Sequence, residues 1–119
     1  MSKTKEELEV NGAERILAER KRQIEKEGWT DRHDDELEED ELARAAACYA
    51  MPKAWRKMKD DWNVSVKDYL WPWDNIWWKP SPKKRIRELE KAGALIAAEI
   101  DRLLRRQRRK THDVSEDYE

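Results

Sequence analysis

Phenylalanine is absent from this chain of 119 residues, and cysteine, glycine and proline are scarce, with one, three and four residues. The single cysteine, Cys48, excludes an internal disulfide. The few glycines form no glycine-rich phosphate loop, and no cysteine and histidine spacing matches a zinc site. No apolar run suits a membrane span or a signal peptide. We therefore expect a cytoplasmic protein with no membrane partner.

Charge is abundant but balanced. Charged residues make up 45% of the chain, and 26 Lys and Arg stand against 27 Asp and Glu. The net charge of -1 gives no overall attraction to nucleic acid, so we do not expect nucleic acid as a partner. The apolar core available to one domain of this length is thin. We therefore expect a homodimer or a homotetramer.

Apolar periodicity predicts an all-α fold with three main helices that assemble into a helical-bundle oligomer. The first helix covers about residues 11–26, with Asn11 as its N-cap and Gly28 as its stop. The second covers about residues 37–50 and ends before Pro52. Its predicted inner face is Leu42, Ala45, Ala46 and Tyr49.

The third helix is predicted to start with Ser81 as N-cap and Pro82 in its first turn, and to end near residue 108. Its predicted inner side holds Ile86, Leu89, Ala92, Gly93, Ile96, Ile100 and Leu103.

The three helices form one predicted domain at residues 11–108, between a flexible N-terminus at residues 1–10 and a flexible acidic tail at residues 109–119. The connection at residues 51–82 holds six of the seven tryptophans. Because long structureless loops are uncommon in compact domains, we expect short helical turns there, for example around residues 53–60.

Several acidic residues could bind a divalent cation. Glu38 and Glu41 would lie one helical turn apart, and carboxylate oxygens suit Mg²⁺ or Mn²⁺. The alternative is a solvated helix edge. Just upstream, His33, Asp34 and Asp35 could extend such a site or order a water molecule, or the aspartates could complement the helix dipole.

One acidic residue of the third helix is also open to two interpretations. Glu99 could turn inward toward a site, or it could pair with Arg102 or Arg106.

The tryptophans also allow two interpretations. Trp71, Trp73, Trp77 and Trp78 could stack on a nucleobase, with nearby cations such as Lys79 on the phosphates. Alternatively, a chain without phenylalanine uses tryptophan to fill its core and subunit interface. The basic residues 102–110 suggest nucleic-acid binding in isolation, but the acidic segment after them favours a solvated helix end.

Ordered sequence blocks give the chain a family resemblance over residues 14–104. They are Glu27-Gly28-Trp29-Thr30, His33-Asp34-Asp35, Glu41-Leu42-Ala43, Trp71-Pro72-Trp73, Trp77-Trp78-Lys79-Pro80 and Lys91-Ala92-Gly93-Ala94-Leu95-Ile96. With them the chain resembles a divergent group of small phage and bacterial proteins related to the MazG-like nucleoside triphosphate pyrophosphohydrolases. This resemblance implies an all-α, oligomeric, Mg²⁺-dependent enzyme that releases a nucleoside monophosphate and pyrophosphate.

The resemblance also implies roles for individual residues. Glu38 and Glu41 match the family's E-x-x-E metal pair, whereas Glu88 matches only the first acid of the later E-x-x-D pair, because Lys91 replaces the second. Either metal binding has been lost, or the remaining ligands come from Glu88, Glu99, Asp34 and Asp35. The implied catalytic residues are His33 and Glu41, and the implied substrate-binding residues are Trp73, Trp77, Trp78 and Lys79.

An alternative function follows if the metal site has been lost. The chain would then be a non-catalytic helical interaction protein, for example a phage accessory factor, that binds its partner through the tryptophan-rich surface.

Overall fold

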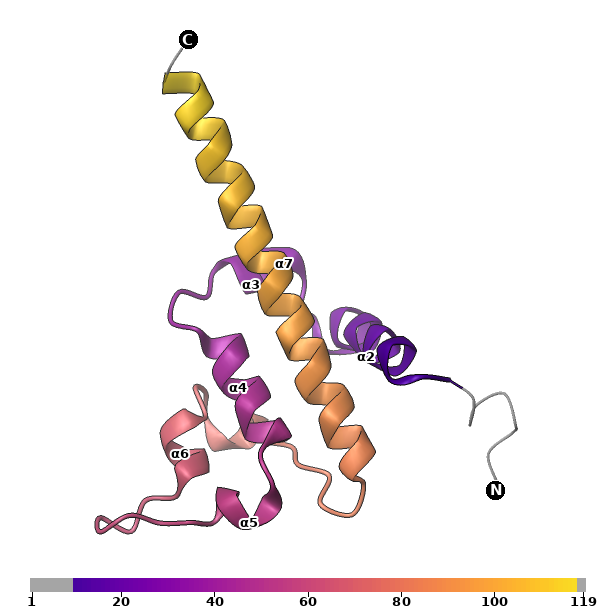
Figure 1. The fold of residues 1–119 in the computed structure, drawn as a ribbon, viewed down its shortest axis with the longest axis vertical. Coiled ribbons are helices and arrows are strands. Elements are labelled where there is room, and N and C mark those ends of the chain that lie inside the picture. The colour runs from indigo at the N-terminus through magenta and orange to yellow at the C-terminus, as the bar shows by residue number, and fades with distance from the viewer. Residues whose placement is uncertain (1–9, 118–119) are drawn as a thin grey trace.

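The computed structural model describes the backbone of residues 10–117 and the side chains of residues 10–111. The predicted flexible N-terminus therefore lies, except for residue 10, outside the described residues. The fold is all-α, as predicted (Figure 1), and an isolated antiparallel bridge joins Lys59 and Ser65. Its helices are α2 (Gly12–Glu27), α3 (Asp31–Asp35), α4 (Glu41–Ala50), α5 (Lys53–Arg56), α6 (Val66–Leu70), the 3-10 helix η1 (Asn75–Trp77) and α7 (Arg85–Asp117). Over residues 10–117, none of the helices has the length and apolar character needed to cross a membrane.

Helix α2 has the predicted caps at both ends. The Asn11 side chain accepts a hydrogen bond from the Glu14 backbone N–H at 2.9 Å. At the other end Gly28 has a left-handed backbone with φ of 74°, which glycine adopts without steric cost, and its N–H bonds to the Gln23 carbonyl.

Helix α4 begins later than predicted. It starts at Glu41 rather than residue 37, and Asp40 just before it has a left-handed φ of 58°. Like charges one turn apart weaken a helix, and Glu38, Glu39, Asp40 and Glu41 are consecutive acids. The predicted inner face of this helix is confirmed, because Leu42, Ala45, Ala46 and Tyr49 are all buried.

Helix α7 differs from the prediction at both ends. Ser81 is not its N-cap, because residues 81–84 form a turn and the helix begins at Arg85, while the Ser81 hydroxyl accepts a hydrogen bond from Lys91 Nζ at 3.2 Å. The helix continues to Asp117, well past the predicted end near residue 108 and into the predicted tail, while residues 118–119 lie outside the described range. The C-terminal part of α7 projects beyond the other helices (Figure 1).

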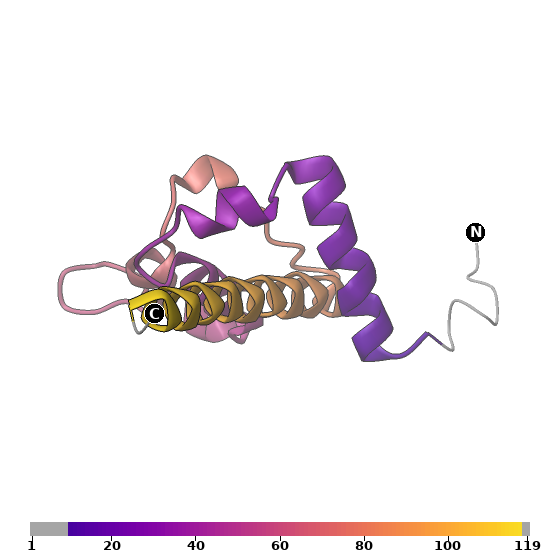
Figure 2. The same cartoon turned by 90° about the horizontal axis from the view of Figure 1, so that it is seen from above.

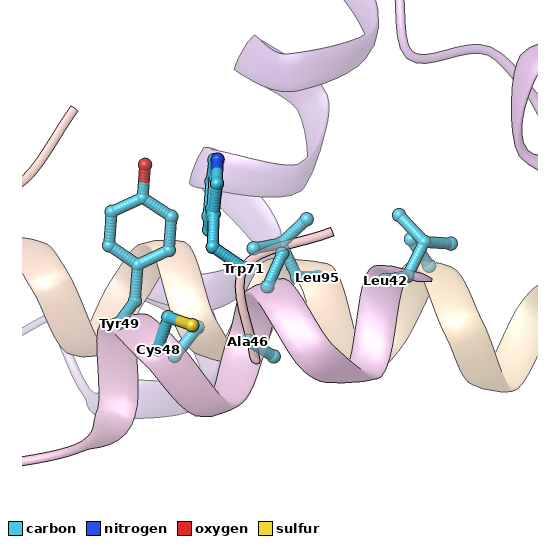
Figure 3. Packing of buried hydrophobic residues seen from close by; sticks show 9 residues of the cluster. Leu42, Ala46, Cys48, Tyr49, Trp71 and Leu95 are labelled. Atoms are coloured by element: carbon cyan, nitrogen blue, oxygen red, sulfur yellow. The ribbon is translucent and has the colours of Figure 1, made fainter. Parts of the chain in front are cut away.

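The core lies between α4 and α7. Figure 3 shows Leu42, Ala46, Cys48 and Tyr49 from α4 beside Leu95 of α7 and Trp71 from the tryptophan-rich segment. Figure 2 shows α2 crossing the N-terminal half of α7, away from the α4 side. At that crossing a Cβ atom added to Gly93 would lie 2.4 Å from Ile16 Cδ1. Glycine therefore permits the close approach of the two helices.

The predicted inner side of α7 is wrong for most of its residues. Ala92 is buried and Gly93 contacts Ile16, but the larger side chains are 41–65% exposed. Helices α4 and α2 instead cover the small-residue side of α7, which contains Ala92, Ala94, Leu95 and Ala98. An apolar stripe stays uncovered in the described chain, formed by Ile86, Leu89, Ile96, Ile100 and Leu103.

The tryptophan-rich connection contains the predicted short helical turns, which are α5, α6 and η1. Its tryptophans differ widely in exposure. Trp71 belongs to the core at 7% exposed, whereas Trp62 is 82% exposed. Both predicted uses of tryptophan, core filling and an accessible surface, therefore occur in one segment.

Candidate functional site

An aromatic pocket of about 420 Å³ lies between the end of α2, helix α3 and the segment around η1. The Trp29 and Trp73 ring centroids are 6.0 Å apart with their planes tilted by 50°. The lining combines flat apolar rings with two carboxylates and one imidazole. Its residues are Glu27, Trp29, His33, Trp73, Asp74 and Trp77.

A basic pocket of about 230 Å³ adjoins the aromatic pocket. The two pockets share Glu27, Trp29 and Trp77 in their linings. Four cationic side chains line the basic pocket, namely Arg22, Lys79, Arg87 and Lys91, along with the carboxylates of Glu19 and Glu27.

Short contacts hold the groups of the basic pocket in place. Lys91 Nζ donates to the Lys79 carbonyl at 2.7 Å, and burial lowers the Lys91 pKa. Arg87 donates to Glu19 Oε1, also at 2.7 Å. Burial alone would raise the Glu19 pKa, but the hydrogen bonds from Arg22 and Arg87 outweigh it, so the pKa is lowered. The cations of this pocket are therefore largely fixed before any ligand binds.

His33 lies in the aromatic pocket with its ring orientation fixed on two sides. Its ring is stacked on Trp29, with centroids 6.4 Å apart and an interplanar angle of 7°. Nδ1 lies 3.1 Å from Oδ1 of Asp34, a fully buried carboxylate whose other oxygen accepts from Arg20 Nη2 at 2.9 Å. Because this carboxylate only accepts hydrogen bonds, His33 donates from Nδ1, which leaves Nε2 as an acceptor.

Most of the carboxylates predicted as metal ligands are paired with arginines. Besides the Asp34 pair with Arg20, Asp35 accepts from Arg105 at 2.9 Å, Glu88 from Arg56 at 2.8 Å, and Glu99 from Arg102 at 2.5 Å. Of the two interpretations of Glu99, the ion pair with Arg102 is therefore the one that occurs. Asp35 also forms a second ion pair, with Arg109 at 3.3 Å.

The proposed Glu38 and Glu41 pair is also separated. Glu38 is exposed and precedes α4, so the two carboxylates do not share a helical face. Glu41 instead accepts a hydrogen bond from the Glu39 backbone N–H. Across the described residues, no three His, Cys, Asp or Glu side chains converge in a way that could hold a metal ion.

The predicted substrate-binding residues fall into two groups. Trp73 and Trp77 line the aromatic pocket, and Lys79 lines the basic pocket with its Nζ 5.8 Å from the Trp77 ring centroid. Trp78 lies elsewhere, since it packs on Tyr49 with centroids 4.7 Å apart and lines a different hollow with Arg56 and Lys67.

No family model matches the chain, and no curated protein or solved structure matches it either. The resemblance to the MazG-like enzymes therefore stays a prediction.

The sequence interpretation missed several residues of the two pockets. Trp29 and Glu27 flank the predicted stop Gly28, yet they line both pockets. Arg22 and Arg87 come from helix positions with no local pattern to distinguish them from solvated charges. Only the block Glu27-Gly28-Trp29-Thr30 contained a signal, because it belongs to the family resemblance.

Proposed function

We propose that this protein binds a nucleoside triphosphate in the joined pockets and hydrolyses its α–β phosphoanhydride, releasing a monophosphate and pyrophosphate. One observation carries the proposal, namely that a tryptophan-lined pocket shares Glu27, Trp29 and Trp77 with a neighbouring pocket lined by four cations. This arrangement suits a molecule with a flat ring at one end and phosphates at the other.

The base would lie in the aromatic pocket. Stacking of a base on an aromatic ring contributes about 1–3 kcal/mol, and every base has a face that can stack. Trp77 is the best placed ring, because it is 53% exposed and borders both pockets. The phosphates would then meet Arg22, Lys79, Arg87 and Lys91, which outnumber the two carboxylates of the basic pocket.

His33 is the candidate general base. In the proposed step a water oxygen attacks the α-phosphorus, the bond to the bridging oxygen breaks, and pyrophosphate leaves. For the His33 imidazole, held by Asp34, to take the proton of the water at Nε2, the α-phosphate has to lie at the junction of the two pockets, because His33 lines the aromatic pocket and not the basic pocket. Mg²⁺ or Mn²⁺ would enter as the counter-ion of the triphosphate.

The first experiment is a panel of ribo- and deoxyribonucleoside triphosphates with Mg²⁺ or Mn²⁺, with products separated by chromatography. We expect monophosphate and pyrophosphate, not diphosphate and phosphate. His33→Asn should lower kcat by about 100-fold or more, because general-base catalysis contributes about that much. Arg32→Gln, an exposed neighbour in α3, is the control and should keep full activity. Absence of turnover with every nucleotide would refute the hydrolase proposal.

Binding can be tested separately from hydrolysis. Trp77→Ala should weaken nucleotide binding by about 10-fold, as expected for the loss of one stacking ring, without a matching fall in melting temperature. Trp62→Ala is the matched control, because Trp62 is 82% exposed and lines neither pocket. Equal effects of the two substitutions on binding would contradict the proposed base site.

The second candidate is a non-catalytic helical interaction protein, and the uncovered apolar stripe of α7 favours it. We propose that this stripe mediates self-association into a homodimer or homotetramer. This proposal is independent of whether the protein is a hydrolase or a non-catalytic interaction protein. We place either function in the cytoplasm, on the grounds of the sequence.

A further inference from the structure

A separate hollow of about 350 Å³ lies beside α5, and we call it the cationic hollow. Four cations line it, namely Lys53, Arg56, Lys57 and Lys67, and its lining contains no carboxylate. It shares no lining residue with the aromatic pocket or with the basic pocket, whose four cations are accompanied by two carboxylates. The cationic hollow is therefore a distinct place where positive charge is concentrated.

Two of its cations are buried and held in position. Arg56 and Lys67 are each 8% exposed. Arg56 donates to Glu88 Oε2 at 2.8 Å, which compensates its charge. Lys67 Nζ donates to Asn75 Oδ1 at 2.7 Å and to Asp68 Oδ1 at 3.2 Å. Because an ammonium group has three N–H donors, one donor of Lys67 has no acceptor among the described residues.

The other two cations have no counter-charge. Lys53 lies in α5 and Lys57 directly after it, and both are exposed. Neither ammonium group forms an ion pair or a hydrogen bond with a residue that the structure describes. The two lysines are four residues apart, and like charges at this spacing on a helix repel each other. An anion between them would remove this repulsion.

The remaining lining is rigid. It consists of Trp78, Pro80 and Pro82. The Trp78 ring centroid lies 5.4 Å from Arg56 Cζ and 5.0 Å from Lys67 Nζ, so the ring contacts both buried cations. Between the two prolines, the Ser81 backbone N–H donates to Glu88 Oε2 at 3.1 Å. These contacts form the hollow before any ligand binds.

We infer that the cationic hollow binds a phosphate group, either as inorganic phosphate or as the phosphate of a small monoester. Lys53 and Lys57 together carry two uncompensated positive charges, and a phosphate monoester carries about −1.5 to −2 at pH 7. Its three oxygens can accept from these two lysines and from the third N–H of Lys67. A carboxylate has a single negative charge and would leave one of the lysines uncompensated. The inference is independent of the proposed function, because it uses no residue of the joined pockets.

The test titrates anions into ¹⁵N-labelled protein near neutral pH at constant ionic strength, and follows the indole N–H signals by NMR. Trp78→Phe identifies the Trp78 signal as the one that disappears. We expect inorganic phosphate and phenyl phosphate to move this signal in a saturable way. Acetate should bind at least about 10-fold more weakly, because it loses one charge-assisted contact. Whichever of the two phosphates binds more tightly identifies the source, the free ion or a monoester.

Two variants assign the binding to the cationic hollow. Lys53→Gln and Lys57→Gln should each weaken phosphate binding by about 10-fold, since a hydrogen bond to a charged group contributes about that factor. Both residues are exposed, so the melting temperature should stay unchanged. Lys83→Gln is the matched control, because it removes the charge of an exposed lysine outside the lining and should leave the dissociation constant within about twofold of wild type.

Two results would overturn the inference. Phosphate that leaves the Trp78 signal unmoved in the wild type shows that the hollow binds no phosphate. Equal weakening by Lys53→Gln and Lys83→Gln shows a general attraction to surface charge and no defined site. Failure of the proposed function is a separate result, because nucleotides in the joined pockets would move the Trp77 signal instead.

Discussion

At the scale of single residues, Glu88 joins three parts of the chain. Its fully buried carboxylate accepts hydrogen bonds from Arg56 Nη1 at 2.8 Å and from the Ser81 backbone N–H at 3.1 Å. Arg56 in turn donates to the α4 carbonyls of Cys48 and Tyr49 at 3.0 and 2.8 Å. The pair therefore ties α5 and the end of α4 to α7.

This arrangement predicts acid sensitivity. Burial alone would raise the Glu88 pKa, but hydrogen bonding and charge attraction from Arg56 lower it below the ordinary 4.5. Glu19 shifts in the same direction, because its hydrogen bonds from Arg22 and Arg87 outweigh its burial. A folded-state pKa below the unfolded value stabilises the protein above the unfolded pKa. We expect a constant free energy of unfolding near neutral pH and a fall as pH decreases below about 4.5.

Urea denaturation across this pH range would measure the effect. Glu88→Gln should lower the free energy of unfolding at neutral pH by about 3 kcal/mol, because it leaves the Arg56 guanidinium buried without its counter-charge. It should also flatten the dependence on pH. The exposed change Glu25→Gln should stay within about 0.5 kcal/mol of wild type. A Glu88→Gln variant as stable as wild type would contradict this account.

The same residues show why the site was only partly predictable. Glu88 was named only through the family resemblance, and Glu99 was left open between an inward position and an ion pair, and both are buried. What each acid meets depends on packing: Arg56 is far from Glu88 in sequence, and only the fold brings them together. Trp73 and Trp77 were predicted to bind a substrate and His33 to be catalytic. The structure brings His33, which is distant in sequence from both tryptophans, into the lining of the same pocket.

At the scale of elements, local signals predicted most helices but not all of their boundaries. The caps of α2 depend on neighbouring residues, and both were identified correctly. The start of α7 was not predicted correctly, because residues 81–84 form a turn that delays the helix to Arg85. Which side of α7 is buried depends on its neighbours, since apolar residues occur around much of that helix.

The crossing of α2 and α7 predicts a specific mutational effect. Gly93→Val would place a branched side chain where Ile16 already lies 2.4 Å from the Cβ position. Overpacking of this kind costs about 1–3 kcal/mol, so the melting temperature should fall. Gly12→Val is the control, because nothing lies within 4 Å of its Cβ position. Similar melting temperatures for the two variants would show that Ile16 moves aside at little cost.

At the scale of the whole molecule, the apolar stripe on α7 has the geometry of a helix-pairing surface. Its positions are separated by three, seven, four and three residues and so lie on one side of the helix, although Ile16 of α2 covers Gly93 between Leu89 and Ile96. The exposed fractions are 48% for Ile96 and 51% for Ile100. A large apolar surface of this kind is typical of an interaction site in soluble proteins.

We therefore predict that the protein sediments as a dimer or larger species at micromolar concentrations in analytical ultracentrifugation. Ile96→Glu and Ile100→Glu should each shift the distribution toward the monomer, because each places a charge in the apolar contact. Arg108→Glu changes the charge of an exposed residue on the same helix and should leave the distribution unaltered. A monomeric wild type would show that the stripe does not mediate self-association.

The buried cysteine gives the molecule an internal reporter of its own opening. Cys48 has 0% exposed surface and belongs to the core on α4, its Sγ donates to the Lys67 carbonyl oxygen of α6 at 3.7 Å, and burial raises its thiol pKa to about 11. Both features suppress attack by the thiolate on an alkylating reagent. Modification of the native protein therefore has to wait until these helices separate. The rate of that modification measures how often the core opens, with no label added and no residue replaced.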